Sequence, residues 1–179
     1  MEKSKSINHM RYLKRFSWFV AVLSVVLVLG GTLSLIGLLP KSMWTGLDAF
    51  LTKMTQIFGI VAVFLIIFRK VWMGVKKSKV LNLRWIFPTW QFLKKRHTLF
   101  GWIVVAAGTA HSLYFLLFIP SDMNGVFSGI LAFVVMILMV LFGYKLNQKV
   151  RTTKYVRLSH TLLGIAFMIG LVYHMVELH

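Results

Sequence analysis

Four histidines fall into two pairs with the same internal spacing. The stretches HTLFGWIVVAAGTAH and HTLLGIAFMIGLVYH each begin and end in histidine, at His97 and His111 and at His160 and His174. Both stretches are apolar, and ionisable residues inside apolar spans are costly and normally have a function. Imidazole serves as a metal ligand and as a proton carrier. The pattern therefore indicates metal or proton chemistry inside these segments.

The two histidines of each stretch lie on one face of a helix but far apart along it. Fourteen steps of about 100° end some 40° short of four full turns, and fourteen rises of 1.5 Å separate the residues by about 21 Å. One metal ion cannot bind both. We therefore expect ligand pairs between the two helices. The remaining histidines, His9 and His179, lie in the tails, where a surface histidine needs no special explanation.

The composition indicates a membrane protein in which helices position these histidines. Of the 179 residues, 58% are hydrophobic, and the apolar segments reach the roughly 20 residues that a helix needs to cross a bilayer. We expect an all-α membrane protein, a bundle of five transmembrane helices that forms a single domain over residues 1–179. The expected spans are Phe16–Leu39, Leu47–Phe68, Thr98–Ile119, Val126–Tyr144 and Leu158–Val176.

The basic residues lie between the apolar segments. The formal net charge is +17, but a nucleic-acid-binding protein would carry this charge on one soluble face, so the distribution argues against nucleic acid as a partner. Short cytoplasmic loops are enriched in Lys and Arg, and an N-terminus inside places 19 of the 21 basic residues inside. We expect a cytoplasmic N-terminus, an extracytoplasmic C-terminus, contact with membrane lipid, and a multi-pass protein of the bacterial plasma membrane.

The stretch LRWIFPTWQFLKKR, around Pro88, combines aromatic and basic side chains before the third span. Such residues favour the membrane–water interface. We expect this segment to lie in the cytoplasmic interface before the third span enters the membrane.

The third and fifth spans point the same way, because one span separates them. His97 is therefore level with His160 near the cytoplasmic face, and His111 with His174 in the outer half. The chain has no cysteine, and the sequence indicates no carboxylate at either level. Zinc or non-haem iron would take three or four protein ligands. One imidazole on each side is what two haem b groups need, since the ring completes the equatorial plane.

The paired H-x13-H pattern on the third and fifth spans resembles the ferric-reductase-like transmembrane family, which includes NADPH oxidases, ferric reductases and the haem subunit of the bacterial methionine sulfoxide reductase system. The resemblance covers the five-span core. By position, it implies that His97 and His160 bind an inner haem and that His111 and His174 bind an outer one. It also implies stepwise single-electron transfer across the membrane, by a ferric-reductase-like oxidoreductase or its haem subunit.

The chain departs from this family in two respects. A sixth span is usual there, and the oxidases continue into a flavin and nicotinamide domain, whereas this sequence stops five residues after His174 and has no Gly-rich dinucleotide fingerprint. We expect no dehydrogenase domain in this chain. The electron donor is then a separate flavoprotein reductase, a membrane quinol or a donor outside, and the acceptor is ferric iron, quinone or an extracytoplasmic redox partner.

Five further residues are candidates for contact with the haem groups. Gly101 and Gly164 follow the inner ligands by four residues, where a missing side chain lets a flat macrocycle approach; close helix packing would also explain them. Arg157 and Arg96 would pair with inner-haem propionates, although the positive-inside rule also places arginines here. Phe167 is the candidate aromatic between the haems, with an ordinary core or lipid-facing position as the alternative.

Two other functions compete with electron transfer. A transporter of metal ions or protons would need polar or carboxylate companions beside the histidines, which the sequence does not indicate. A non-redox membrane anchor would use the histidines only for packing. If the histidines bind haem, each should donate its second ring N–H to a carbonyl one turn back or to a nearby hydroxyl.

Overall fold

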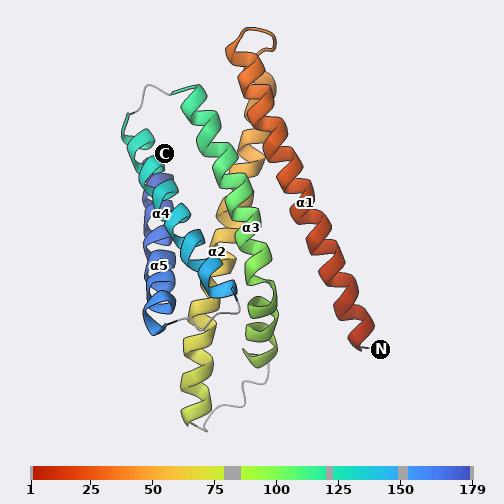
Figure 1. The fold of residues 1–179 in the computed structure, drawn as a ribbon, viewed down its shortest axis with the longest axis vertical. Coiled ribbons are helices and arrows are strands. Elements are labelled where there is room, and N and C mark those ends of the chain that lie inside the picture. The colour runs from red at the N-terminus through yellow and green to blue at the C-terminus, as the bar shows by residue number, and fades with distance from the viewer. Residues whose placement is uncertain (1, 79–85, 120–122, 149–152, 178–179) are drawn as a thin grey trace.

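The computed structural model is an all-helical protein of five long helices, and it describes residues 2–78, 86–119, 123–148 and 153–177. Each helix is long and apolar enough to cross a membrane, which confirms the predicted all-α class and the predicted number of long apolar helices. The helices run alternately up and down, so that α1 begins and α5 ends at opposite ends of the bundle (Figure 1). They are α1 (Glu2–Leu35), α2 (Ser42–Ser78), α3 (Ile86–Leu117), α4 (Met123–Asn147) and α5 (Lys154–Glu177).

Several helices extend well beyond the predicted apolar spans. Helix α2 has 37 residues and is therefore about 55 Å long, against a hydrocarbon core of about 30 Å. Hydrophobicity marks only the part of a helix inside lipid, whereas the backbone hydrogen bonds continue through polar residues. Helix α1 conversely ends at Leu35, four residues before the predicted end of the first span.

The segment around Pro88 is helical and continuous with α3, and its position in the membrane interface stays a prediction. From Ile86 onward it forms the first turns of α3, continuous with the rest of that helix. Pro88 falls within the first turn, where proline is tolerated because the first N–H groups of a helix have no partner inside it. The three residues of this stretch before Ile86 lie outside the described residues.

The turn between α1 and α2 is set by a glycine. Gly37 has φ of 80°, a left-handed conformation that residues with a Cβ rarely adopt. The Leu38 N–H donates to the Leu33 carbonyl at 3.0 Å and the Gly37 N–H to the Ser34 carbonyl at 3.1 Å. This is the Schellman arrangement that ends helices, and it allows α2 to return antiparallel to α1.

Helix α3 is the central element. It packs against α1, α2 and α4, and its buried side chains Ile103 and Ala107 join Val20 and Leu27 of α1 and Leu51 of α2 in one apolar core. Because α3 is enclosed on several sides, its neighbours hold the side chains on it in fixed directions.

Helices α4 and α5 form a second unit beside α3. Val104 of α3 meets Met136 of α4 and Phe167 and Leu171 of α5 in a smaller core. Helix α5 contacts α4 and α2. No Cα atom of α5 comes within 8 Å of one in α3 over the described residues, so these two helices face each other only through side chains.

The basic side chains gather at one end of the bundle. At the lower end in Figure 1, α1, α3 and α5 begin while α2 and α4 end. Lys41, in contrast, lies in the turn at the opposite end. The basic residues in the parts of the helices near the lower end are Arg11, Lys14, Arg15, Arg69, Lys70, Lys94, Lys95, Arg96, Lys145, Lys154 and Arg157.

Candidate functional site

The four histidines meet in two pairs between α3 and α5. The ring centres of His97 and His160 are 6.0 Å apart, with their planes at 85°. The ring centres of His111 and His174 are 6.3 Å apart, with their planes at 67°. The structure thus brings together the pairs that the helical geometry predicts. The imidazole rings approach each other across the gap between the backbones of α3 and α5.

The separation of the rings suits one metal ion between the members of each pair. An imidazole nitrogen binds a transition metal at about 2.0 Å. Two such bonds in line, together with the distance from each nitrogen to its ring centre, place the ring centres about 6 Å apart. Rings in direct packing contact can lie closer, as the 4.7 Å between His111 and Phe115 shows.

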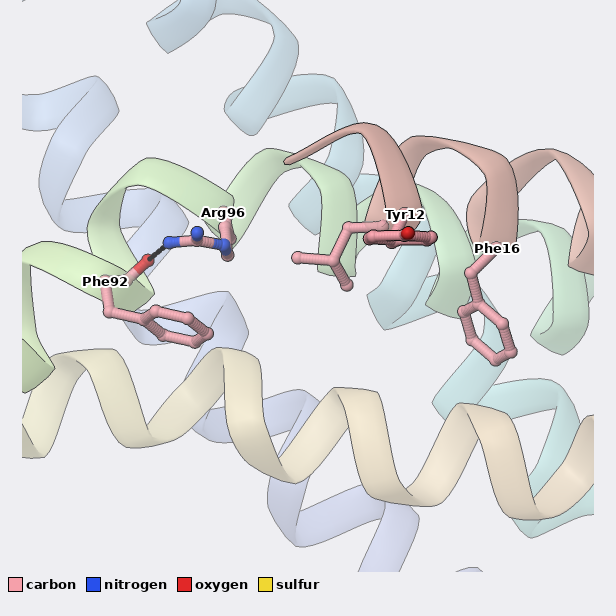
Figure 2. Close-up of a pocket in the computed structure, with 5 residues that line it drawn as sticks. Tyr12, Phe16, Phe92 and Arg96 are labelled. Carbon is pink, nitrogen blue, oxygen red and sulfur yellow. Dashed lines mark hydrogen bonds between the residues drawn. The ribbon is translucent and has the colours of Figure 1, made fainter. Parts of the chain in front are cut away.

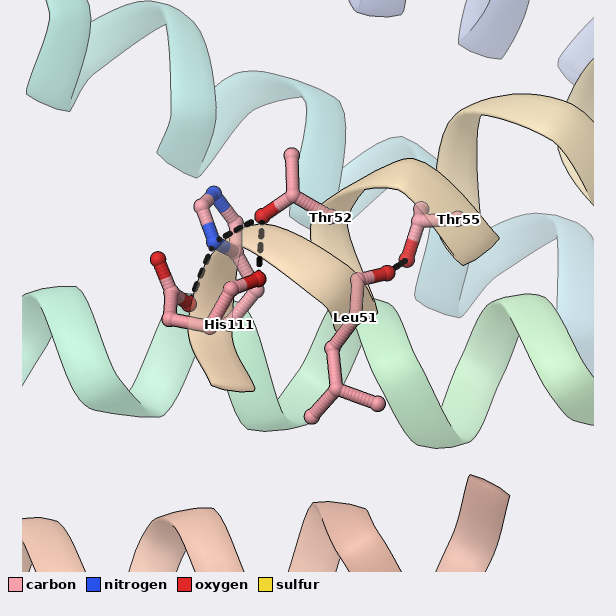
Figure 3. A network of polar contacts seen from close by, with 5 residues as sticks. Leu51, Thr52, Thr55 and His111 are labelled. Carbon is pink, nitrogen blue, oxygen red and sulfur yellow. Dashed lines mark hydrogen bonds and ion pairs between the residues drawn. The ribbon is translucent and has the colours of Figure 1, made fainter. Parts of the chain in front are cut away.

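His111 is held from α2 by a carboxylate and a hydroxyl (Figure 3). Its Nδ1 lies 2.9 Å from Oδ1 of Asp48 and 2.8 Å from Oγ1 of Thr52. The Thr52 hydroxyl donates its own hydrogen to the Asp48 backbone carbonyl at 2.9 Å, so towards the ring it accepts. Both partners are therefore acceptors, Nδ1 carries the hydrogen, and the Nε2 lone pair is free to bind a metal.

The two histidines of α5 are held in the same way, by acceptor atoms of α4 that contact their Nδ1 atoms. Nδ1 of His174 lies 3.0 Å from the hydroxyl oxygen of Ser128, which donates its hydrogen to the Gly125 carbonyl at 3.0 Å. Nδ1 of His160 lies 3.0 Å from the Met139 carbonyl, which can only accept. Both rings therefore carry the hydrogen on Nδ1 and leave the Nε2 lone pair free.

His97 differs from the other three. Its Nδ1 is buried beside the backbone of Ala62 on α2 but has no partner within hydrogen-bonding geometry. A buried N–H without an acceptor is costly. This histidine is the least constrained of the four.

The structure corrects one expectation about the surroundings of the histidines and bears out part of another. A carboxylate does lie at the level of His111, because the up-and-down packing brings the start of α2 beside the end of α3, and Asp48 is buried there. The predicted contact with a nearby hydroxyl is confirmed for His111 and His174, which meet Thr52 and Ser128 of neighbouring helices. His160 contacts the Met139 carbonyl of α4 instead of a carbonyl one turn back in its own helix.

Two glycines of α4 make room for the rings of α5. A Cβ atom at Gly129 would lie 3.0 Å from Cε1 of His174, and one at Gly143 would lie 3.0 Å from Cε1 of His160. The two glycines are fourteen residues apart, the same spacing as the two histidines. Because α4 and α5 are antiparallel neighbours, equal spacing places one of these glycines opposite each ring. We call the two positions, where no side chain fills the space, the notches of α4.

A cavity of about 100 Å³ lies beside the His111–His174 pair. Its walls come from α2, α3, α4 and α5 and are mostly apolar or small, so they suit the apolar faces of a macrocycle better than a hydrated ion. Its lining includes Gly108, His111, Gly129, Ala132, Phe167 and His174.

The glycines predicted to face a macrocycle have different surroundings. A Cβ atom at Gly101 would have no atom of the described residues within 4 Å, whereas one at Gly164 would contact Ile66 of α2 and Met139 of α4 at 3.7 and 3.8 Å. No described side chain fills the position beside Gly101. Gly164 serves close packing of α5 against its neighbours.

The remaining three predicted residues also differ from one another in burial and surroundings. Phe167 is buried in the second core, and a Cβ atom at Gly59 of α2 would lie 3.4 Å from its Cε1. Arg157 is exposed at the start of α5. Arg96 is buried, and its guanidinium lies over the ring of Phe92 on the side of α3 that faces α1 (Figure 2).

Asp48, Thr52, Ser128, Gly129 and Gly143 were not identified from the sequence. Two signals were available: Asp48 is an acidic residue within an apolar span, and the two glycines repeat the spacing of the histidines. Thr52 and Ser128 carry no comparable signal.

No family model, curated protein or solved structure matches the chain. Over the described residues, no group of three or more His, Cys, Asp or Glu side chains gathers to hold a metal ion. The functional assignment accordingly depends on the two histidine pairs and the residues that hold them.

Proposed function

We propose that this protein is a transmembrane electron-transfer protein that binds two haem b groups, one between His97 and His160 and one between His111 and His174. The observation that carries the proposal is the pair of cross-helix histidine contacts, 6.0 and 6.3 Å between ring centres. Three of the four rings are held with Nε2 free, as axial ligands require.

The donor set fits haem better than a bare metal ion. Each level offers two imidazoles, and the Asp48 carboxylate is occupied with Nδ1 of His111 instead of standing beside the two rings as a third ligand. A haem iron takes its four equatorial ligands from its own ring and needs only the two axial ones from protein. The apolar cavity at the second pair and the open space at Gly101 provide room for part of each macrocycle.

The residues of this chain would hold and isolate the two groups. When bound, haem supplies reversible one-electron chemistry at its iron. Asp48 and Thr52 fix the ring orientation of His111, and Ser128 fixes that of His174. Because two histidines would hold each group, bound haem would supply electron transfer and not a site for oxygen or substrate, so the protein would act as a conduit. Phe167, buried between the two levels, separates the pairs along α5.

The basic end of the bundle is the cytoplasmic end in this proposal. Basic residues near the start of α1, α3 and α5 lie at the same end (Figure 1), and cytoplasmic loops carry such an excess. The His97–His160 pair is then the inner one in a bacterial plasma membrane. The His97–His160 side would face the donor, a flavoprotein reductase or a quinol, and the His111–His174 side would face the acceptor, which would be ferric iron, quinone or an extracytoplasmic redox partner.

The first experiment is the absorption spectrum of the purified full-length chain. We expect a b-type spectrum that dithionite reduces, with two haems per chain by pyridine haemochrome assay. Protein that folds into a helical bundle but takes up no haem, during expression or when haem is added, would exclude the proposal. Stopped-flow reoxidation of the reduced protein by ferric chelates and by quinones then distinguishes the acceptors.

A second candidate function is transport of protons or metal ions. The part-buried Asp48–His111 pair favours it, because a carboxylate beside a histidine inside a membrane is the companion that a transporter uses. Proteoliposomes distinguish the two functions. A transporter moves protons or divalent ions without any chromophore, and Asp48→Asn abolishes that movement, whereas an electron conduit shows neither effect.

A further inference from the structure

A second cavity, of about 300 Å³, lies between α1 and α3 on the basic side of the bundle (Figure 2). Tyr12, Leu13 and Phe16 of α1 and Phe92 and Arg96 of α3 line it. It is separate from the space between α3 and α5 that the histidines occupy. Its walls are aromatic and aliphatic apart from one cation.

That cation is unusually poorly partnered. Arg96 is only 6% exposed, its Nε is buried with no hydrogen-bond partner, and its Nη1 reaches the Phe92 carbonyl at a long 3.5 Å. The guanidinium carbon lies 3.9 Å from the centre of the Phe92 ring. No carboxylate of the described residues pairs with it. A buried arginine in a membrane protein normally has an anionic partner.

Further positive charge adjoins the lining residues in the sequence. Five exposed basic residues lie within two positions of a lining residue, on α1 or on α3, and all of them belong to the basic end of the bundle. Basic pockets between transmembrane helices on the cytoplasmic side bind anionic lipid head groups. These residues are Arg11, Lys14, Arg15, Lys94 and Lys95.

We propose that the cavity between α1 and α3 binds an anionic phospholipid, whose phosphate contacts Arg96 and whose apolar part lies along Leu13, Phe16 and Phe92. Guanidinium matches phosphate oxygens in shape and in hydrogen-bond donors. A haem propionate is a less suitable anion for this arginine, because Arg96 faces α1 while the neighbouring His97 faces α5. The lipid site does not depend on the bound haem and goes beyond electron transfer.

Native mass spectrometry of the purified full-length protein tests the proposal, with phosphatidylglycerol and phosphatidylcholine offered in equal amounts. We expect wild type to retain one phosphatidylglycerol with about a tenfold preference, in line with a charge-assisted contact. Arg96→Gln should lose this preference, and Arg96→Lys should keep part of it. Arg69→Gln is the matched control, because Arg69 is an exposed arginine on α2 and its loss should change nothing.

Three outcomes would overturn the proposal. An unchanged preference in Arg96→Gln means that this arginine does not bind the phosphate. An equal loss in Arg69→Gln means that the lipid responds only to total charge. Loss of one haem from Arg96→Gln with lipid retention intact means that the guanidinium contacts a propionate. Circular dichroism of each variant establishes that it is folded. If Arg96→Gln does not fold, the comparison is made between wild type and Arg96→Lys, which should keep only part of the preference.

Discussion

The two histidine pairs have nearly equal ring separations but very different surroundings. Around His111 and His174, a carboxylate and two hydroxyls from α2 and α4 accept from the Nδ1 atoms. Around His97 and His160, a single backbone carbonyl accepts from His160, and His97 has no partner in good geometry. One pair is therefore set in a polar network and the other in an almost apolar environment.

This difference has a redox consequence if both pairs bind haem. A carboxylate that accepts from Nδ1 raises the basicity of the imidazole and stabilises the oxidised, more positive iron. The haem at His111 and His174 should then have the lower midpoint potential. The difference between the two midpoint potentials thus measures how strongly Asp48 acts on His111. The following substitutions test this expected difference.

The largest effect is expected from removal of the ligands. His97→Ala and His160→Ala should each abolish the same haem, and His111→Ala and His174→Ala the other, since one axial ligand alone gives a weak and open site. Haem content by pyridine haemochrome should fall from two to one in each variant, and redox titration shows which haem remains. Loss of the same haem in all four variants would refute two separate levels.

A somewhat smaller effect is expected when the notches on α4 are filled. Gly129→Val should displace the His174 ring and Gly143→Val the His160 ring, because a Cβ atom alone would already lie 3.0 Å from each ring. Overpacking of this kind costs about 1–3 kcal/mol, which corresponds to roughly tenfold or more in haem retention. The measurement is haem dissociation to apomyoglobin.

Gly74→Val is the matched control for these two variants, because a Cβ atom there meets nothing within 4 Å. If both notch variants release the same haem, or if the control releases as much, the notches do not act on individual rings.

Replacement of Asp48 sharpens the comparison directly. Asp48→Asn removes the charge but keeps a hydrogen-bond acceptor, so the haem should stay bound while its potential rises. The expected change is on the order of 60 mV, which is tenfold in a one-electron equilibrium. Spectroelectrochemical titration should show this change only for the haem that His111→Ala removes. Equal movement of both potentials, or of neither, would contradict the role of Asp48.

The smallest effect is expected at Ser128. Ser128→Ala leaves the His174 N–H without its acceptor, and a neutral hydrogen bond is about half as strong as a charged one. We expect a rise of roughly 30 mV for the same haem. Ser24→Ala is the control, since this buried hydroxyl donates only to Val20 in its own helix. A larger change than in Asp48→Asn would reverse the ranking of the two partners.

Most of the fold could be predicted from the sequence, but its boundaries could not. Apolar runs and the distribution of basic residues predict five long apolar helices in an alternating arrangement, because lipid admits few other structures. The start of α3 was misplaced by twelve residues, since the helix continues through polar and aromatic residues that hydropathy excludes. The histidine pairs followed from the equal spacing and from the parallel direction of the third and fifth spans, because helical periodicity fixes which residues share a face.

The sequence by itself determined the chemistry that is available: four histidines on two parallel helices, two levels, no thiolate, and a chain suited to lipid. Only the tertiary structure decided how each ring is held. The partners of the histidines come from α2 and α4, and Asp48 stands 63 positions before the ring it contacts. Such contacts depend on how the helices pack and rotate against one another, which local periodicity does not specify.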